Sequence, residues 1–308
     1  MTTIAFLGTG LMGTGFIRHA RAKGLTVRAW NRSAAKAQAL AAGDAGVTAC
    51  ATVAEAVRGA ERIHLSLSDD ASVDAVLDPL ASSGALPAGA WVVDHTTTAV
   101  RPTAERAARW HARGVRFVHA PVFMAPANCA EGTGLMLISG DLAHRERAGP
   151  LPSANTGVRS TEVVDPALQG ALQAMTGTLL YLGPQPERAA AFKLFGNLTL
   201  LSILGILGDV GRLAAAVGID MKDAFTLFDH FNPGQTLPQR AKRISSGQYS
   251  PPSFEMSMAR KDLRLMVEEA ARGGQTLAMV PALAKLLDEG IARGEGALDV
   301  AAAVRVPG

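Results

Sequence analysis

A glycine-rich turn near the N-terminus constrains the fold of this chain more than any other feature. A short apolar run at residues 3–8 ends in the segment Gly8–Gly13, which has the pattern Gly-x-Gly-x-x-Gly. A helical pattern follows over 14–23, and a second apolar run at 25–30 predicts a strand. Strand, glycine-rich turn, helix and strand within about thirty residues are typical of the first unit of a parallel, doubly wound sheet.

Each glycine of this turn has a separate physical role. Gly8 permits a tight turn, Gly10 lets a ligand approach the backbone, and Gly13 lets the helix pack closely on the strand. The start of the helix offers free N–H groups to an anion. We therefore predict that the turn, with Leu11 and Met12 between its glycines, binds the pyrophosphate of a dinucleotide.

The residues after the second strand indicate which dinucleotide is bound. Sites for NAD place an acidic residue there to bind the ribose 2′-hydroxyl, whereas sites for NADP need a cation for the 2′-phosphate. This chain has Asn31, Arg32 and Ser33 there, with Lys36 one helical turn later and no carboxylate among them. Because a guanidinium binds phosphate well, the sequence favours NADP(H) over NAD(H).

Strands and helices continue to alternate through the first part of the chain. This alternation predicts an α/β Rossmann domain with a parallel doubly wound sheet. Ligands of such sheets bind beyond the carboxyl ends of the strands, so the loops that end strands should form the site. The expected helices are 34–42, 53–59, 71–80 and 103–113, the expected strands are 62–67, 91–94 and 116–119, and the expected loops are 67–70, 94–98 and 119–125.

The second part of the chain has a different pattern. Residues 141–166 are rich in Pro, Gly, Ser and Thr without clear periodicity, which predicts an irregular excursion before a last strand at 179–182. Everything after that is predicted to be helical. We expect a Rossmann domain at 1–184 and an all-α domain at 185–308. The expected helices are a long interdomain helix at 187–217 and others at 220–230, 236–245, 254–271 and 280–293.

The long helix is apolar nearly all round over 194–207, which predicts burial on several sides. A membrane span is disfavoured, because about 15 residues separate Lys193 from Asp209 and Asn197 interrupts them, whereas a span needs about 20. One small helical domain cannot cover so much apolar surface, so we expect a homodimer. Lys193 and Asn197 lie four residues apart and therefore on one face of the helix.

The composition of the whole chain restricts the function classes. The chain has 308 residues, 48% of them hydrophobic and 19% charged, with a net charge of +3. Its Lys and Arg residues are scattered, which argues against a nucleic-acid partner. Cys50 and Cys129 form no metal or disulfide pattern, and the N-terminus has no basic region before its apolar run. We expect a cytoplasmic protein without a metal site.

Several motifs, taken together, resemble those of the β-hydroxyacid dehydrogenase family, which includes 3-hydroxyisobutyrate dehydrogenases and glyoxylate or succinic-semialdehyde reductases. The resemblance runs nearly end to end. The motifs are the Gly8–Gly13 turn, Asp94-His95-Thr96-Thr97, Ala120-Pro121-Val122 with Gly132-Thr133, Lys193-Leu194-Phe195-Gly196-Asn197, and Lys261-Asp262-Leu263.

The resemblance implies that the chain is a dehydrogenase or reductase acting on CH–OH groups, with a catalytic role for Lys193. In the family this lysine exchanges a proton with the substrate oxygen while hydride moves to or from the nicotinamide. A partly desolvated ammonium suits this role, because burial moves the pKa of a lysine towards neutral pH. Asn197 would orient the substrate and the lysine.

The resemblance also assigns residues around the cofactor. Thr97 would contact the nicotinamide end, with Thr96 beside it on the substrate side. Leu67 and Ser68 would line the cofactor, and Lys261 would close over it from the helical domain.

One segment departs from the family pattern. After Ala-Pro-Val the family usually has Ser-Gly-Gly, a small loop that holds a substrate carboxylate, whereas this chain has Phe123-Met124-Ala125, and His119 replaces the usual Asp. Phe and Met donate no hydroxyl and fill the space that glycines leave open. The sequence thus predicts a more apolar substrate pocket, unless Phe123 and Met124 point into the core.

Three functions remain open at this point. The first is an NADP(H)-dependent oxidoreductase that acts on a carbonyl compound or hydroxy acid through Lys193. The second is reduction of an imine, which the loss of the Ser-Gly-Gly loop favours but the presence of Lys193 disfavours. The third is a non-catalytic protein that binds NADP, against which the pair of Lys193 and Asn197 argues.

Overall fold

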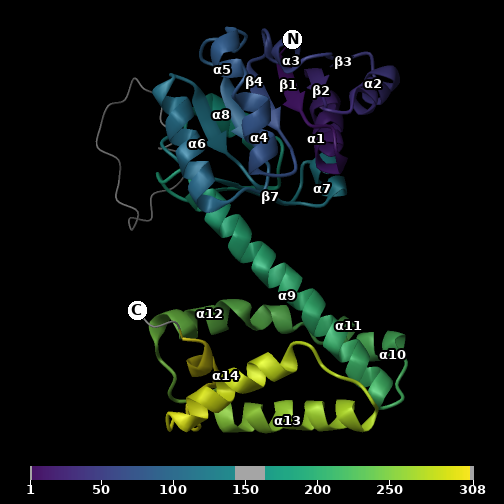
Figure 1. Ribbon diagram of the computed structural model, residues 1–308, viewed down its shortest axis with the longest axis vertical. Helices are drawn as coiled ribbons and strands as arrows, with labels where there is room; N and C mark the ends of the chain where they lie inside the picture. Colours follow the sequence, from purple (N-terminus) through teal and green to yellow (C-terminus); the bar gives the residue numbers. More distant parts are fainter. Residues whose placement is uncertain (1, 143–163, 306–308) are drawn as a thin grey trace. The chain divides into compact units, whose positions relative to one another are not determined.

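Six parallel strands form the main sheet of the computed structural model, which describes residues 2–142 and 164–305. The strand order is β3-β2-β1-β4-β5-β6, the doubly wound arrangement that the sequence predicts, with helices on both faces (Figure 1). The strands are β1 Thr3–Leu7, β2 Thr26–Trp30, β3 Val47–Ala49, β4 Arg62–Leu65, β5 Trp91–Asp94 and β6 Arg116–His119. The helices are α1 Leu11–Ala22, α2 Ala34–Gly43, α3 Val53–Val57, α4 Asp70–Leu77, α5 Leu80–Ser83 and α6 Val100–Ala112.

Several of these boundaries differ from those expected: β4 ends at Leu65 instead of residue 67, α3 ends at Val57 instead of 59, and α4 ends at Leu77 instead of 80. Helix α1 begins at Leu11, inside the glycine-rich turn, and α6 begins at Val100 instead of residue 103. Pro102 lies in the first turn of α6, where a helix needs no N–H donor, so proline does not prevent an earlier start. Strand β3 was not expected, because three residues are too few to show a period.

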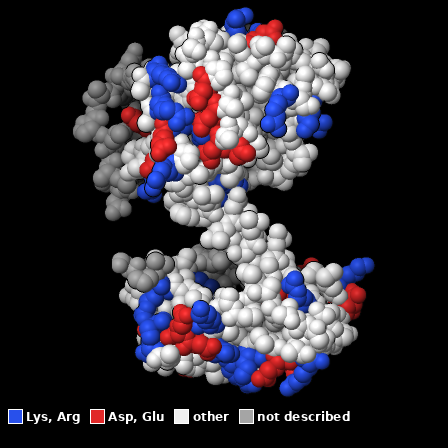
Figure 2. All heavy atoms as spheres, viewed as in Figure 1, with Lys and Arg blue, Asp and Glu red and all other residues white. Residues whose placement is uncertain are grey.

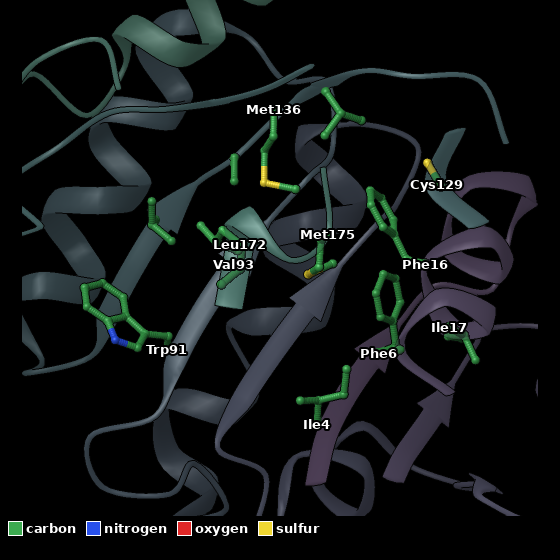
Figure 3. Packing of buried hydrophobic residues seen from close by; sticks show 14 of the residues in the cluster. Ile4, Phe6, Phe16, Ile17, Trp91, Val93, Cys129, Met136, Leu172 and Met175 are labelled. Carbon is green, nitrogen blue, oxygen red and sulfur yellow. The ribbon is translucent and has the colours of Figure 1, made fainter. Parts of the chain in front are cut away.

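The two faces of the sheet bury separate hydrophobic clusters. Along β1, Ile4 and Phe6 belong to one cluster, whereas Ala5 and Leu7 belong to the other. This alternation follows from the two-residue period of a strand. Figure 3 shows Phe6 and Phe16 next to each other in the first cluster, with ring centroids 5.9 Å apart. Helix α1, which follows the glycine-rich turn, is thus fixed on the sheet.

A second sheet of three strands, in the order β7-β8-β9, follows the first in the chain. Strand β7 is antiparallel to β8, and β8 is parallel to β9. The sequence predicted β9 within one residue but not the other two strands. The elements are β7 Val122–Phe123, α7 Pro126–Glu131, β8 Leu135–Ile138, α8 Pro166–Gln173 and β9 Thr178–Tyr181. Most of the segment expected to be irregular, 141–166, lies outside the described residues.

The chain divides into two compact units, residues 1–197 and 198–308, and the long helix α9 Arg188–Ala216 contributes to both. The predicted domain boundary, 184/185, precedes α9. The second unit is helical in its described residues, as expected. Its elements are α10 Met221–Phe225, α11 Leu227–His230, η2 Pro233–Thr236, α12 Leu237–Ser246, α13 Met256–Arg272, α14 Val280–Ala292 and η3 Val300–Val304.

The middle of α9 is exposed in the single chain, contrary to the expected burial. Leu198, Leu201 and Leu204 are 69%, 66% and 64% exposed, and most of this helix is free of charged residues in Figure 2. The helix is long and apolar enough to cross a membrane by length and composition alone, which is weak evidence for a span. An apolar surface of this size is instead typical of an interface.

Candidate active site

The glycine-rich turn after β1 has the shape that a dinucleotide pyrophosphate requires. Gly8 has a φ of +101°, and a Cβ there would lie 2.2 Å from the carbonyl oxygen of Ser66. A Cβ on Gly13 would lie 2.0 Å from the carbonyl oxygen of Gly8. A Cβ on Gly10, by contrast, would meet no atom within 4 Å, and the start of α1 has no side-chain cap. Gly8 and Gly13 are needed for packing, whereas Gly10 leaves space for a ligand beside free N–H groups.

The residues after β2 divide into one that shapes the turn and three that are exposed. The side-chain oxygen of Asn31 accepts a hydrogen bond of 2.9 Å from the N–H of Thr9, within the glycine-rich turn. Arg32, Ser33 and Lys36 are exposed beside it. Asn31 therefore supports the turn, and the cations remain accessible to a phosphate.

Arg32 is electrostatically coupled to the loop after β4. Hydrogen bonds from Ser72 lower the pKa of Asp69 below its ordinary value, and the charge of Arg32 lowers it further. Because β1 and β4 are neighbours at the point where the strand order reverses, this loop lies at the crevice that binds ligands in such sheets.

The loops after β4 and β5 are joined by Thr96. Its hydroxyl oxygen accepts a hydrogen bond of 3.0 Å from the N–H of Leu67, and its side chain is buried. Thr97 is exposed, as is Ser68, whose hydroxyl lies 2.8 Å from that of Ser72. In this structure Thr96 holds the two loops together from the interior, whereas Thr97 and Ser68 are accessible to a ligand.

A buried pair of histidines lies beneath these loops. His95 Nδ1 is 2.7 Å from the carbonyl oxygen of Ala120, so this nitrogen carries a hydrogen. His95 Nε2 then accepts the hydrogen bond of 3.0 Å from His64 Nδ1, and both rings are neutral. Burial lowers the pKa of both rings, that of His95 to about 4. The sequence did not predict this pair: His64 lies within the strand expected at 62–67, and His95 directly follows the strand expected at 91–94.

The buried His119, at the position where the family usually has Asp, lies close to the carboxylate of Asp94. Its Nδ1 is 3.7 Å from a carboxylate oxygen of Asp94, and its Nε2 is 3.5 Å from the hydroxyl of Thr98. Burial by itself would raise the pKa of Asp94, but His119 and hydrogen bonds from Thr96 hold it below the ordinary value. These groups link the ends of β5 and β6 in the interior.

The segment after β6 directs its two large side chains differently. The sulfur of Met124 lies 3.8 Å from the sulfur of Cys129 on α7, and Met124 packs against the core. Phe123 instead contacts α9. Ala125 is exposed, and its N–H donates a hydrogen bond to Asn128. Of the three residues that replace Ser-Gly-Gly, only Met124 points into the core.

Lys193 is buried against this segment, with only 9% of the residue exposed. Its Nζ lies 4.2 Å from the centre of the Phe123 ring, and burial lowers its pKa. Among the described residues, no carboxylate or carbonyl oxygen pairs with it. Ser139 fixes the start of α9 by accepting a hydrogen bond from the N–H of Ala189 and donating one to the carbonyl of Pro186, both 2.9 Å.

Two further residues predicted to belong to the site, Asn197 and Lys261, lie on different helices. Asn197 follows Lys193 by one turn of α9 and is half-buried. Lys261 lies on α13 of the second unit, where it is exposed and forms an ion pair of 3.0 Å with Asp262. Its role in closing over the cofactor stays a prediction.

Most of the first unit matches a known family. A family model, the NAD binding domain of 6-phosphogluconate dehydrogenase, matches residues 3–157. The chain belongs to this family. This match confirms the predicted dinucleotide-binding Rossmann domain and the broad dehydrogenase family.

Individual relatives agree with this assignment. The human cytokine-like nuclear factor N-PAC is 29% identical over 269 residues, covering 86% of this chain but only 44% of N-PAC. An uncharacterized oxidoreductase of Shewanella frigidimarina is 26% identical, over 90% of this chain and 88% of that protein. A reductive aminase from Aspergillus terreus, solved with NADPH4, cyclohexanone and allyl amine, shares the fold with a TM-score of 0.81. Its identity is 21%, over 99% of this chain and 98% of that one. The chain thus has the fold of a nicotinamide-binding oxidoreductase.

Proposed function

We propose that this protein is an NADPH-dependent reductase that acts on a carbonyl compound, with Lys193 as the proton donor. The observation that carries the proposal is the burial of Lys193 without a carboxylate partner among the described residues, in the unit that contains the glycine-rich turn. A lysine placed only for stability would normally have an ion-pair partner or extend to solvent.

The chemistry needs one hydride and one proton. Bound NADPH supplies the hydride to the carbonyl carbon. Lys193 donates a proton from Nζ to the carbonyl oxygen, so the product is an alcohol and the lysine is left neutral. Because burial lowers the pKa of Lys193, this proton is easier to release than that of a solvated lysine. Asn197, one turn later on α9, would orient the substrate.

The preference for NADPH over NADH rests on the residues after β2. Arg32 and Lys36 are exposed near the glycine-rich turn, and the side chain of Asn31 accepts a hydrogen bond from the N–H of Thr9. A 2′-phosphate would gain charge-assisted hydrogen bonds from the guanidinium.

The substrate pocket favours a neutral carbonyl compound over a short carboxylate. Nζ of Lys193 lies 4.2 Å from the centre of the Phe123 ring, and neither the Phe123 nor the Met124 side chain can donate a hydrogen bond to a carboxylate. An apolar wall beside the lysine favours substrates with an apolar group next to the carbonyl.

Imine reduction is a second candidate. The apolar segment at Phe123 favours it, and the reductive aminase shares the fold. In that reaction Lys193 would protonate nitrogen in place of oxygen. A third candidate, NADP binding without catalysis, is disfavoured because a pure binder has no need of a lysine that is buried without an ion-pair partner among the residues the structure describes.

The first experiment is NADPH oxidation against a matched panel of substrates. The panel contains glyoxylate and succinic semialdehyde, neutral aldehydes and ketones, and cyclic imines, each repeated with NADH. Turnover of neutral carbonyls with NADPH supports the proposal. Turnover of only the carboxylates would show that the segment at Phe123 still binds the substrates usual in the family, and turnover of only imines would favour the second candidate.

The role of Lys193 is tested by Lys193→Ala, which should lower kcat at least 100-fold and leave the Kd for NADPH within threefold. The matched control is Lys222→Ala, at an exposed lysine on α10. Activity of Lys193→Ala within a few-fold of the parent protein would refute the mechanism, and silence of the parent across the whole panel with intact NADPH binding would favour the third candidate.

We further propose that the protein is a cytoplasmic homodimer, in which a second copy covers the exposed apolar surface of α9. The exposure of Leu198, Leu201 and Leu204 supports this proposal.

A further inference from the structure

The contact between Phe123 and α9 leads to an inference about how the proposed proton donor is positioned. We infer that Phe123 is a positioning residue for Lys193, and that glycine at position 196 is the partner that allows it to act. The inference deepens the proposed function and rests on it, because positioning matters for catalysis only if Lys193 donates the proton.

The ring of Phe123 lies directly on the backbone of α9. A Cβ added to Gly196 would be 2.2 Å from Cζ of Phe123 and 2.5 Å from one of its Cε atoms. No carbon atom tolerates such distances, so any residue other than glycine would displace the ring. A large residue on β7 and the absence of a side chain on α9 are therefore complementary.

The same ring contacts Lys193, which lies three residues before Gly196 and hence on the same face of the helix. The distance of 4.2 Å from Nζ to the ring centre is well within the range of a cation–π interaction. The ring face carries partial negative charge and stabilises the ammonium, while burial destabilises it.

Charged groups on the neighbouring elements are engaged elsewhere. Arg188, at the start of α9, lies over the ring of Phe192, and His119, at the end of β6, faces Asp94 and Thr98. Burial lowers the pKa of Lys193, and no charged side chain of the described residues forms an ion pair with it. The ring of Phe123 is thus the group that holds the ammonium in place.

The backbone that carries Phe123 is fixed by its neighbours. Strand β7 pairs Phe123 with Leu135 of β8, and the preceding Ala120 carbonyl accepts the hydrogen bond from His95. The ring therefore extends from a strand whose position is set by pairing with β8. Replacing Phe123 by a residue with an aliphatic side chain should remove the stabilisation of the Lys193 ammonium while Lys193 stays buried.

The test measures the titration of Lys193 without using activity. The protein is labelled with traces of acetic anhydride between pH 6 and 11, and the Lys193 peptide is quantified by mass spectrometry. In Phe123→Leu the midpoint should fall by about 0.4–1.5 pH units, because a cation–π contact is worth about 0.5–2 kcal/mol and one pH unit corresponds to about 1.4 kcal/mol. An unchanged or higher midpoint would overturn the inference.

Phe192→Leu is the matched control. Phe192 is also on α9 and also lies under a cation, Arg188, but it does not contact Lys193 in any interaction of the described residues. The midpoint of Lys193 should not change in this variant. A shift equal to that of Phe123→Leu would mean that the helix responds to any lost phenylalanine, and the inference would fail.

The partnership with Gly196 gives a second, independent test. Gly196→Ala should displace the ring and lower the midpoint as Phe123→Leu does, whereas the double variant should show no additional shift, because leucine leaves space for the new methyl group. Additive shifts would overturn the partnership. If Phe123→Leu does not fold, Gly196→Ala alone tests the inference, because an unchanged labelling midpoint of Lys193 in this variant contradicts it.

The failure of this inference is distinguishable from the failure of the proposed function. If Lys193→Ala keeps its activity while Phe123→Leu lowers the midpoint, the positioning is correct and the mechanism is wrong. If both proposals hold, the pH–rate profile of Phe123→Leu should move with the labelling midpoint while the KM for NADPH stays within threefold.

Discussion

Acidification should destabilise the first unit through the buried histidine pair. His95 donates from Nδ1 to Ala120 and accepts at Nε2 from His64, so a second proton on His95 would break the bond between the rings. Burial lowers the pKa of His95 from its ordinary value of 6.5 to about 4, although the hydrogen bond to Ala120 and the charge of Asp94 oppose this. The pKa of His64 is also well below its ordinary value.

The magnitude follows from proton linkage. In the unfolded chain His95 binds its proton near pH 6.5, whereas in the folded protein it does so only near pH 4. The stability that the neutral ring contributes is therefore complete above pH 6.5 and is lost as the pH falls towards 4. A gap of about 2.5 pH units corresponds to a loss of about 3 kcal/mol in the free energy of unfolding. Asp94 does not contribute in this window, because its folded pKa lies below 3.8.

The assay is urea unfolding at pH 7, 6, 5 and 4, followed by tryptophan fluorescence. All three tryptophans, Trp30, Trp91 and Trp110, lie in the first unit, so the signal reports on that unit. The test variant is His95→Asn, which retains an N–H donor near Ala120 but does not titrate, and the control is His230→Asn at an exposed position. The loss between pH 7 and 4 should be about 3 kcal/mol smaller in His95→Asn than in the parent and in the control. Equal losses in all three proteins would refute the argument.

Four other predictions concern the glycine-rich turn, the cofactor site and assembly. Gly10→Ala should leave the free energy of unfolding within about 0.5 kcal/mol, because no protein atom lies within 4 Å of its Cβ, but should weaken NADPH binding at least tenfold by filling the space proposed for the pyrophosphate; a fully retained affinity would contradict binding of the pyrophosphate at this turn. Gly13→Ala should destabilise the protein by about 1–3 kcal/mol in urea unfolding, because its Cβ would overlap the carbonyl oxygen of Gly8. Arg32→Ala should raise the Kd for NADPH at least tenfold and that for NADH little, as measured by fluorescence titration, and equal losses would exclude a contact with the 2′-phosphate. Light scattering should give about twice the monomer mass of 31.9 kDa, and Leu201→Glu should shift the protein to monomer; a monomeric parent at micromolar concentration would refute the dimer.

Local chemistry made much of the fold predictable. The spacing of the glycines at 8, 10 and 13 is dictated by close contacts within a single turn, and the alternation of β1 follows from strand geometry. Helix α9 was predictable because it contains no proline and Gly218 follows shortly after its end at Ala216. These features depend on neighbours in the sequence, so the sequence contains the information needed to find them.

Contacts between distant segments were not predictable in the same way. Strand β7 has two residues, too few to show which of Phe123 and Met124 faces the core, and its pairing with β8 decides this. His64 and His95 are adjacent only because β4 and β5 pair in register. No local pattern distinguishes such histidines from ordinary core or surface ones.

The sequence by itself determined the glycine-rich turn that binds a dinucleotide, the doubly wound parallel sheet, and the position of Lys193 on the long helix. The tertiary structure alone decided what surrounds that lysine. Strand β7 comes from far earlier in the chain than α9, and its phenylalanine ring fits only where Gly196 leaves the helix backbone bare. The fit between the Phe123 ring and Gly196, which has no side chain, depends on how close the two residues lie in space. It therefore cannot be found before the two segments are placed together in the fold.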